Sequence, residues 1–198
     1  MLVFKRNPWR RLRAQGFMEA LWLTGGPAVK KSAALYTTPM VNPRKSSAKT
    51  TASALASQLE AAQAHCRARG GRLTAQRKEI LELLLRRGGS AKAYDLQDDM
   101  RARHGRVAPS TVYRALEFLM HQHLVHRVDA LNTFIVCNAE HTAHHPLLLV
   151  CSSCEAVTEL HDDQAYEAVQ KTLRQAGGGF VEAEIEVKGT CGKCRAQA

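Results

Sequence analysis

Residues 109–128, PSTVYRALEFLMHQHLVHRV, decide the fold of this chain. The proline and the two hydroxyl residues at its start favour the first turn of a helix. Val112, Leu116 and Leu119 follow at helical spacing, so one face of that helix is expected to be buried. The last five letters, LVHRV, change to a short strand pattern. The stretch therefore predicts a helix that leads directly into a strand.

Helices are also predicted upstream of this stretch, and a hairpin at its end. Residues 53–69 are rich in alanine, glutamine and leucine, a second helix follows the N-cap residue Thr74, and a third covers residues 93–103. Residues 124–128 and 133–137 form the two strands of the hairpin. Three or four helices followed by a hairpin is the order of a winged helix-turn-helix. The core positions expected in the second and third helices are Ile80, Leu81, Leu84, Leu85, Leu96 and Met100.

The chain after the hairpin has a different order of predicted strands and helices. Residues 146–151 and 156–160 are predicted strands, residues 162–175 a helix, and residues 180–187, FVEAEIEV, a half-buried strand with period-two alternation. The helix is expected to turn three apolar residues inward, namely Ala165, Val169 and Leu173. A small α+β domain of this kind, with edge strands, would close by dimerising.

Two Cys-x-x-Cys pairs lie in this second half, one after its first predicted strand and one after its last. Cys151 and Cys154 form one pair and Cys191 and Cys194 the other, with 36 residues between them. Two such pairs supply the four thiolates of a closed, tetrahedral structural zinc site. The separation exceeds the about 15–20 residues of a compact zinc ribbon, so the zinc would join distant parts of one domain. Disulfides or a thioredoxin-like redox pair are the alternatives, and the absence of a convincing export signal disfavours them.

The net charge of +10 is unevenly distributed. Residues 1–50 contribute +9, residues 51–130 contribute +5 and residues 131–198 contribute −4. A basic tail binds polyanions with little specificity, so the division of the remainder into a basic and an acidic half is the more informative feature. It predicts a nucleic-acid-binding part followed by a part with another role.

Three segments are expected from these patterns: a basic, disordered extension at 1–52, a DNA-binding domain at 53–137, and a dimerisation and metal-binding domain at 138–198. No apolar stretch approaches the about 18 residues that span a bilayer. We therefore expect a cytoplasmic protein with no membrane partner.

The run at 109–128, the cysteine-bearing strand after it, the histidine cluster HTAHH and the two Cys-x-x-Cys pairs together resemble the ferric uptake regulator family, and within it the zinc uptake regulators. The resemblance covers about residues 55–195. It implies an N-terminal winged helix and a small C-terminal α/β dimerisation domain. It also implies a homodimer that binds double-stranded operator DNA, represses zinc-uptake genes in response to zinc, and has no small-molecule substrate.

The resemblance implies a second, regulatory zinc site with the ligands His126, Cys137, His144 and Glu159. One thiolate, two imidazoles and one carboxylate favour zinc over manganese or ferrous iron, which take more oxygen ligands. By sequence alone, HTAHH leaves the choice of histidine open, and the offset from Cys151 favours His144. Two zinc ions per protomer are expected. A third site would use His141, His145 and His161.

By the same resemblance, Tyr94 and Arg114 would read bases, Tyr113 would contact the DNA backbone, and Arg72 would contact a phosphate or the minor groove. Alternatively, Tyr113 packs in the core and Arg114 is an ordinary surface arginine. Asp98 and Arg101 have the spacing of an exposed i,i+3 pair, and the resemblance implies that they pair between neighbouring dimers on DNA.

There are two alternatives to this function. The first is a regulator of the same fold that senses iron, manganese or peroxide. An enzyme such as a zinc deaminase needs H-x-E together with P-C-x-x-C, and neither pattern occurs here. The predicted mechanism is that zinc held by both domains fixes the angle between them and so selects the DNA-binding conformation.

Overall fold

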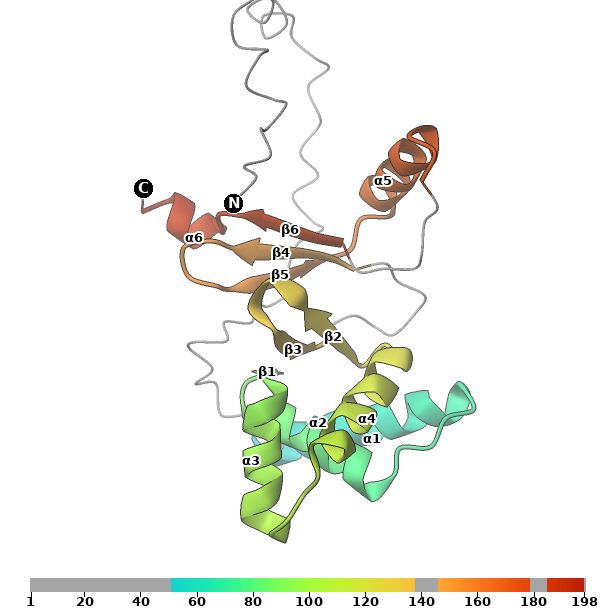
Figure 1. The fold of residues 1–198 in the computed structure, drawn as a ribbon, viewed down its shortest axis with the longest axis vertical. Helices are drawn as coiled ribbons and strands as arrows, with labels where there is room; N and C mark the ends of the chain where they lie inside the picture. Colours follow the sequence, from blue (N-terminus) through green and yellow to red (C-terminus); the bar gives the residue numbers. More distant parts are fainter. Residues whose placement is uncertain (1–50, 138–145, 179–184, 198) are drawn as a thin grey trace, which may run out of the picture. The chain divides into compact units, whose positions relative to one another are not determined.

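The computed structural model describes residues 51–137, 146–178 and 185–197 (Figure 1). All of them belong to one compact unit. In chain order the elements are α1 (Ala52–Ala68), α2 (Ala75–Arg86), β1 (Ser90–Ala91), α3 (Ala93–His104), α4 (Pro109–His121), β2 (Val125–Val128), η2 (Asp129–Leu131), β3 (Thr133–Val136), β4 (Leu147–Cys151), β5 (Val157–Leu160), α5 (Asp163–Gln175), β6 (Ile185–Gly189) and α6 (Gly192–Arg195).

Helices α1 to α4 begin where the sequence predicts. Thr51 caps α1, with its hydroxyl accepting the Ala54 N–H at 3.3 Å, and Pro109 occupies the first turn of α4. The Asp95 carboxylate accepts the Lys92 N–H at 3.4 Å and so closes the first turn of α3. Thr74 precedes α2 as expected but makes no side-chain capping hydrogen bond.

These helices share one apolar core, and the predicted inward faces are confirmed. Helix α2 packs against α1, α3 and α4. The side chains that are least exposed in this core are Cys66, Ile80, Leu84, Leu96, Leu116, Leu119 and Val125. Burial of this kind contributes about 25 cal/mol per Å² of apolar surface, so this core is the main source of the domain's stability.

A three-stranded antiparallel sheet with the order β1-β3-β2 completes the winged helix. The hairpin of β2 and β3 was predicted, whereas β1 was not, because two residues are too short to show a period. In the register, His126 lies opposite Ile135 and Ser90 also pairs with Ile135. The 3-10 turn η2 and the left-handed Asn132, at φ +48°, connect the two wing strands.

A second sheet has the order β5-β4-β6, with β4 antiparallel to β5 and parallel to β6. Strand β6 ends at Gly189, two residues beyond the predicted end, because its pairing with β4 continues to Cys151. Residues 180–184 of the predicted strand lie outside the described residues. Helix α6, which follows the last strand, was not predicted.

The two sheets meet through a shared apolar cluster. Val128 and Ile135 come from the wing, and Leu148, Val150 and Val157 come from the second sheet. Leu148 and Val128 are fully buried there. The contact places strands β2 and β5 close enough for their polar side chains to interact. The predicted domain boundary at 137/138 stays a prediction, because residues 138–145 lie outside the described part of the chain.

The predicted face of α5 is partly wrong. Leu173, expected inward, is 41% exposed, and the buried residue of the helix is Tyr166. Ala165 and Val169 are half-buried. A helical period identifies an apolar face, but it does not say which element covers that face.

Among the described residues, no helix is long and apolar enough to cross a membrane.

Candidate metal centres

Four cysteine sulfurs converge at the end of the second sheet. Cys151 ends β4, Cys154 lies in the following turn, and Cys191 and Cys194 belong to α6 and its N-cap. All four Sγ atoms lie within 4.8 Å of one another, and the sulfurs of Cys154 and Cys191 are 3.7 Å apart. A tetrahedron with Zn–S bonds of about 2.3 Å has sulfur–sulfur edges of about 3.8 Å. The thiols are free, so the arrangement fits a four-thiolate metal site better than two disulfides.

The backbone prepares this cluster for a cation. The Cys191 N–H donates to Cys151 Sγ at 3.3 Å, and this bond, followed by the Cys154 N–H, lowers the pKa of the Cys151 thiol to about 6. The neighbouring sulfurs of Cys154 and Cys191, followed by burial, raise the pKa of Cys194 to about 12. The lowered pKa favours the ionised form of Cys151, whereas hydrogen bonds with neighbouring sulfurs, followed by burial, favour the protonated form of Cys194.

A second cluster is completely buried where the two sheets meet. It consists of His126 on β2, Cys137 directly after β3, and Glu159 on β5, with exposed fractions of 2%, 5% and 2%. The His126 Nε2 atom is 3.1 Å from Glu159 Oε1, and the Cys137 Sγ–H donates to the same oxygen at 3.4 Å. Their ligand atoms lie within 4.8 Å of one another.

The fold fixes each of these three donors. Cys137 is held by its own N–H, which donates to the Leu124 carbonyl at 3.0 Å. His126 is placed by its pairing with β3, and Glu159 by its pairing with Leu148 in β4. A buried carboxylate is costly unless it is paired or bound to a metal. A soft thiolate, an imidazole and a carboxylate around one point fit a zinc ion.

The remaining predicted histidines divide into two groups. His161 follows β5, and its Nε2 atom lies 3.6 Å from Glu159 Oε1, with the side chain 34% exposed. It therefore lies beside the second cluster, and the predicted third site with His141 and His145 stays a prediction. The fourth predicted ligand, His144, lies outside the described residues, as do His141 and His145.

The predicted DNA-contacting residues are exposed. Tyr94 at the start of α3 is 66% exposed and Tyr113 at the start of α4 is 58% exposed. The alternative in which Tyr113 packs in the core is therefore wrong. Arg114 is exposed and borders a cavity of about 310 Å³ between the starts of α2 and α4, whereas Arg72 is exposed in the loop before α2. Asp98 and Arg101 pair with each other within the chain at 3.3 Å.

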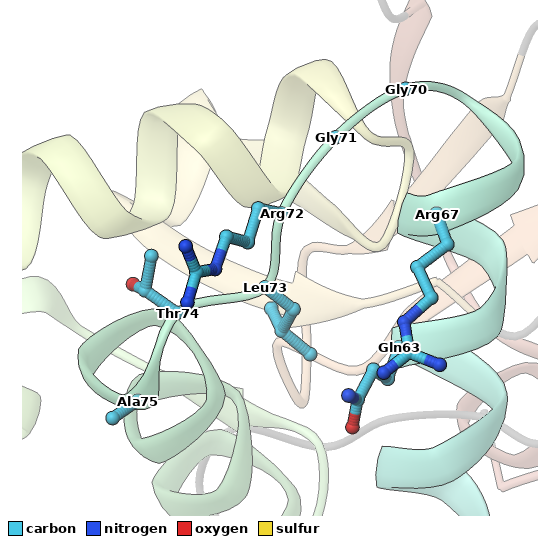
Figure 2. Close-up of a pocket in the computed structure, with 8 residues that line it drawn as sticks. All are labelled: Gln63, Arg67, Gly70, Gly71, Arg72, Leu73, Thr74 and Ala75. Carbon is cyan, nitrogen blue, oxygen red and sulfur yellow. The ribbon is translucent and has the colours of Figure 1, made fainter.

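Sequence reasoning missed a second basic pocket, of about 520 Å³, beside Arg72. Figure 2 shows Gln63 and Arg67 of α1 on one side of it and Leu73 on the loop that follows. The sequence alone does not identify Arg67 as a binding residue, because arginines are common on exposed helix faces. Both Arg67 and Arg72 line this pocket, so it adds basic groups to the exposed surface in front of α2.

Comparison with known proteins agrees with this geometry. Residues 68–188 match the Ferric uptake regulator family. The "Zinc uptake regulation protein" of Escherichia coli K12 is 34% identical over 147 residues, which cover 74% of this chain and 84% of that protein. The protein of the same name from Mycobacterium tuberculosis H37Rv is 33% identical over 131 residues, 65% of this chain and 98% of that protein.

Two solved structures share the fold. The zinc uptake regulator complexed with zinc and DNA has a TM-score of 0.64 and 32% identity, over 72% of this chain and 96% of that one. The crystal structure of holo XcZur has a TM-score of 0.63 and 35% identity, over 71% of this chain and 98% of that one. The family match spans more than half of the sequence and includes the winged helix from α2 to β3 and most of the second sheet. The chain belongs to the ferric uptake regulator family.

Proposed function

We propose that this protein is a zinc-responsive transcriptional repressor that binds operator DNA and controls genes of zinc uptake. The observation that carries the proposal is the buried cluster of His126, Cys137 and Glu159, to which the winged helix and the second sheet both contribute. Two of the similar proteins are named zinc uptake regulation protein, and a similar solved structure is a zinc uptake regulator complexed with zinc and DNA. Members of the family are regulators and not enzymes.

The donor set supports zinc as the sensed metal. Cys137 supplies a soft ligand at a site where manganese and ferrous iron would favour oxygen or nitrogen. His144 is proposed as the fourth ligand. Together with the four-cysteine cluster, which has a structural role, this gives two zinc ions per protomer. A regulator of iron, manganese or peroxide remains the alternative, and the thiolate disfavours it.

The mechanism follows from which element holds each donor. When bound, a zinc ion would link the imidazole and thiolate of the winged helix to the carboxylate of the second sheet. His126 and Cys137 are held by the wing, and Glu159 is held by β5. Keeping the three together holds the wing at a defined angle to the sheet. Because two recognition helices must meet half-sites about one helical turn apart, that angle decides whether a dimer fits its operator. By linkage, operator DNA must tighten zinc binding in return.

Residues at the starts of α3 and α4 are proposed to read the operator. Tyr94 and Arg114 would contact bases, Tyr113 the backbone, and Arg72 a phosphate or the minor groove. Their exposure supports this role. Asp98 and Arg101 are proposed to exchange partners between neighbouring dimers, which their side-chain exposures of 49% and 44% would permit.

The proposed partner of the second sheet is another copy of this chain. Leu173 on α5 and Val187 on β6 are large apolar residues of the second half, and each is 41% exposed. A second copy would cover them. A DNA-binding regulator would act in the cytoplasm, where the operators lie.

A gel-shift titration at fixed salt tests the function. Operator binding is expected to require free zinc and to be lost in Cys137→Ala combined with His126→Ala. His121→Ala, at an exposed histidine near the end of α4, is the matched control and should behave as wild type. Binding that ignores zinc would disprove the proposal. Stronger activation by buffered ferrous iron or manganese would favour the alternative.

A further inference from the structure

A second carboxylate of the sheet also reaches the wing. Glu186 on β6 accepts the backbone N–H groups of Asp129 and Ala130, the latter at 3.0 Å. These are the first two residues of η2, which directly follows the strand that carries His126. Glu186 therefore ties the turn of the wing to the far edge of the second sheet.

The register places Glu186 and Glu159 on one face of that sheet. Leu148 in the central strand pairs with Glu159 on β5 and with Glu186 on β6. Residues that lie side by side across a sheet point to the same face. Leu148 is fully buried in the apolar cluster shared with the wing, so this face is the one that meets the wing.

Leu148, Glu159 and Glu186 each contact a different part of the wing. Leu148 supplies apolar contact in the middle, Glu159 reaches the end of the wing that carries His126, and Glu186 reaches the turn beyond it. The interaction of Glu186 is made with main-chain donors, and a hydrogen bond to a charged group is stronger than a neutral one. It needs no metal ion to form. Glu186 therefore holds the wing against the second sheet, as the regulatory site does, but it does so without a metal ion.

We propose that Glu186 is a latch that holds the wing on the sheet and thereby sets how tightly the regulatory site binds zinc. This rests on the proposed function, because it needs zinc to bind at His126, Cys137 and Glu159. If a ligand binds only one conformation, its apparent affinity is its intrinsic affinity multiplied by the fraction of protein in that conformation. Glu186 raises the fraction in which His126 and Glu159 lie together. Losing it makes zinc binding weaker by about fivefold, the lower end of the usual coupling between linked sites.

The variant Glu186→Gln tests the latch in the full-length protein. With zinc kept in the four-cysteine site, the regulatory site is titrated with zinc against a chelator and, separately, with cobalt(II), whose thiolate absorption reports Cys137. The expected result is an affinity about fivefold weaker at the regulatory site and unchanged at the four-cysteine site. Glu167→Gln makes the same chemical change at an exposed position of α5 and should have no effect.

Hydrogen exchange gives a readout that does not depend on metal. The amides of Asp129 and Ala130 should exchange faster in Glu186→Gln than in the wild type while the regulatory site is still without metal. Faster exchange with unchanged zinc affinity would overturn the proposal, because Glu186 would then be a local structural residue only. Unchanged exchange and unchanged affinity would also overturn it.

A second variant removes the latch from the other side and covers the case in which Glu186→Gln folds poorly. Asp129→Pro deletes one of the two donors, and proline is well tolerated at the first position of a helical turn. It should weaken zinc binding as Glu186→Gln does, and the double variant should lose little more. Asp129→Ala keeps the N–H and removes only the carboxylate that pairs with Arg127, so it is the matched control.

The experiments distinguish a failure of the latch proposal from a failure of the proposed function. If the wild-type protein takes up no zinc or cobalt at the regulatory site, the proposed function fails. If it does so and neither Glu186→Gln nor Asp129→Pro changes the affinity, only the latch fails.

Discussion

The His126 Nε2 atom lies 3.1 Å from Glu159 Oε1 although the two residues belong to different sheets, one in the wing and the other in the C-terminal domain. Both side chains are buried. Because each sheet contributes one residue of the pair, a change in protonation or metal binding at this site acts on both sheets at once.

The variant Glu159→Gln should separate metal binding from folding. It keeps the volume and an acceptor oxygen beside His126 and Cys137, so the free energy of unfolding of the metal-free protein should change by only about 1 kcal/mol, the net worth of about one hydrogen bond. Zinc affinity at the regulatory site should fall by at least about 100-fold, since even residues that only support a ligand are worth about 10–100-fold. Calorimetry and chelator competition measure the two effects. A variant that still responds normally to zinc would remove Glu159 from the ligand set.

Loss of the four-cysteine site should act differently. Cys194→Ser removes one thiolate from a closed tetrahedral site, so native mass spectrometry should show one zinc fewer per protomer. Structural zinc is coupled to folding, so the variant should also have a lower melting temperature and bind operator poorly even in excess zinc. Cys66→Ala serves as a control, because Cys66 is buried in the helical core away from both clusters. It should lower the melting temperature through lost packing and leave the zinc count unchanged.

The metal-free protein should show a pH dependence that traces to Cys151 and Cys194. The pKa of Cys151 falls from an unfolded value of 9.0 to about 6, so its contribution to stability is complete above pH 9 and is lost as the pH falls from 9 to 6. The pKa of Cys194 rises from 9.0 to about 12, so its contribution is complete below pH 9 and is lost between pH 9 and 12.

Together the two thiols favour greatest stability of the metal-free form near pH 9. Denaturant unfolding with chelator and reductant, compared between the wild type and Cys151→Ser, isolates the first contribution. The difference between these two proteins should grow from pH 6 to pH 9. A difference that stays constant over this range would contradict the assigned ionisation of Cys151.

Arg114 and Arg72 should differ in how they affect DNA binding. Arg114→Ala should cost about 1–3 kcal/mol on the operator and relax the preference for one base pair, because an arginine that reads guanine makes paired hydrogen bonds to it. Arg72→Ala should weaken binding to all sequences alike and reduce the salt dependence by about one counterion. Fluorescence anisotropy with operator and scrambled DNA at several salt concentrations measures both. Identical behaviour of the two variants would remove the distinction between base and phosphate contacts.

Most of the fold was predictable because it depends on local patterns. The apolar periods of α2 and α4 and the starts of these helices, after Thr74 and at Pro109, agree with the structure. The regulatory donors were found only through the family resemblance, since His126, Cys137 and Glu159 are separated in sequence and meet through sheet packing. Glu186 was not found at all, because its partners are backbone N–H groups, which no residue type identifies.

Leu173 shows what a single chain does not predict about its own surface. Its helical period indicates an inward position, yet the described chain leaves it 41% exposed, and we propose that a second copy covers it. Leu173→Asp should therefore leave the secondary structure unchanged and weaken the dimer by at least about tenfold, which corresponds to about 1.4 kcal/mol of lost apolar burial. Lys171→Asp changes the charge of an exposed residue on the opposite side of the same helix and should leave the dimer intact. Analytical ultracentrifugation over a concentration series gives the dissociation constant. An unchanged dimer in Leu173→Asp would move the interface away from this face of α5.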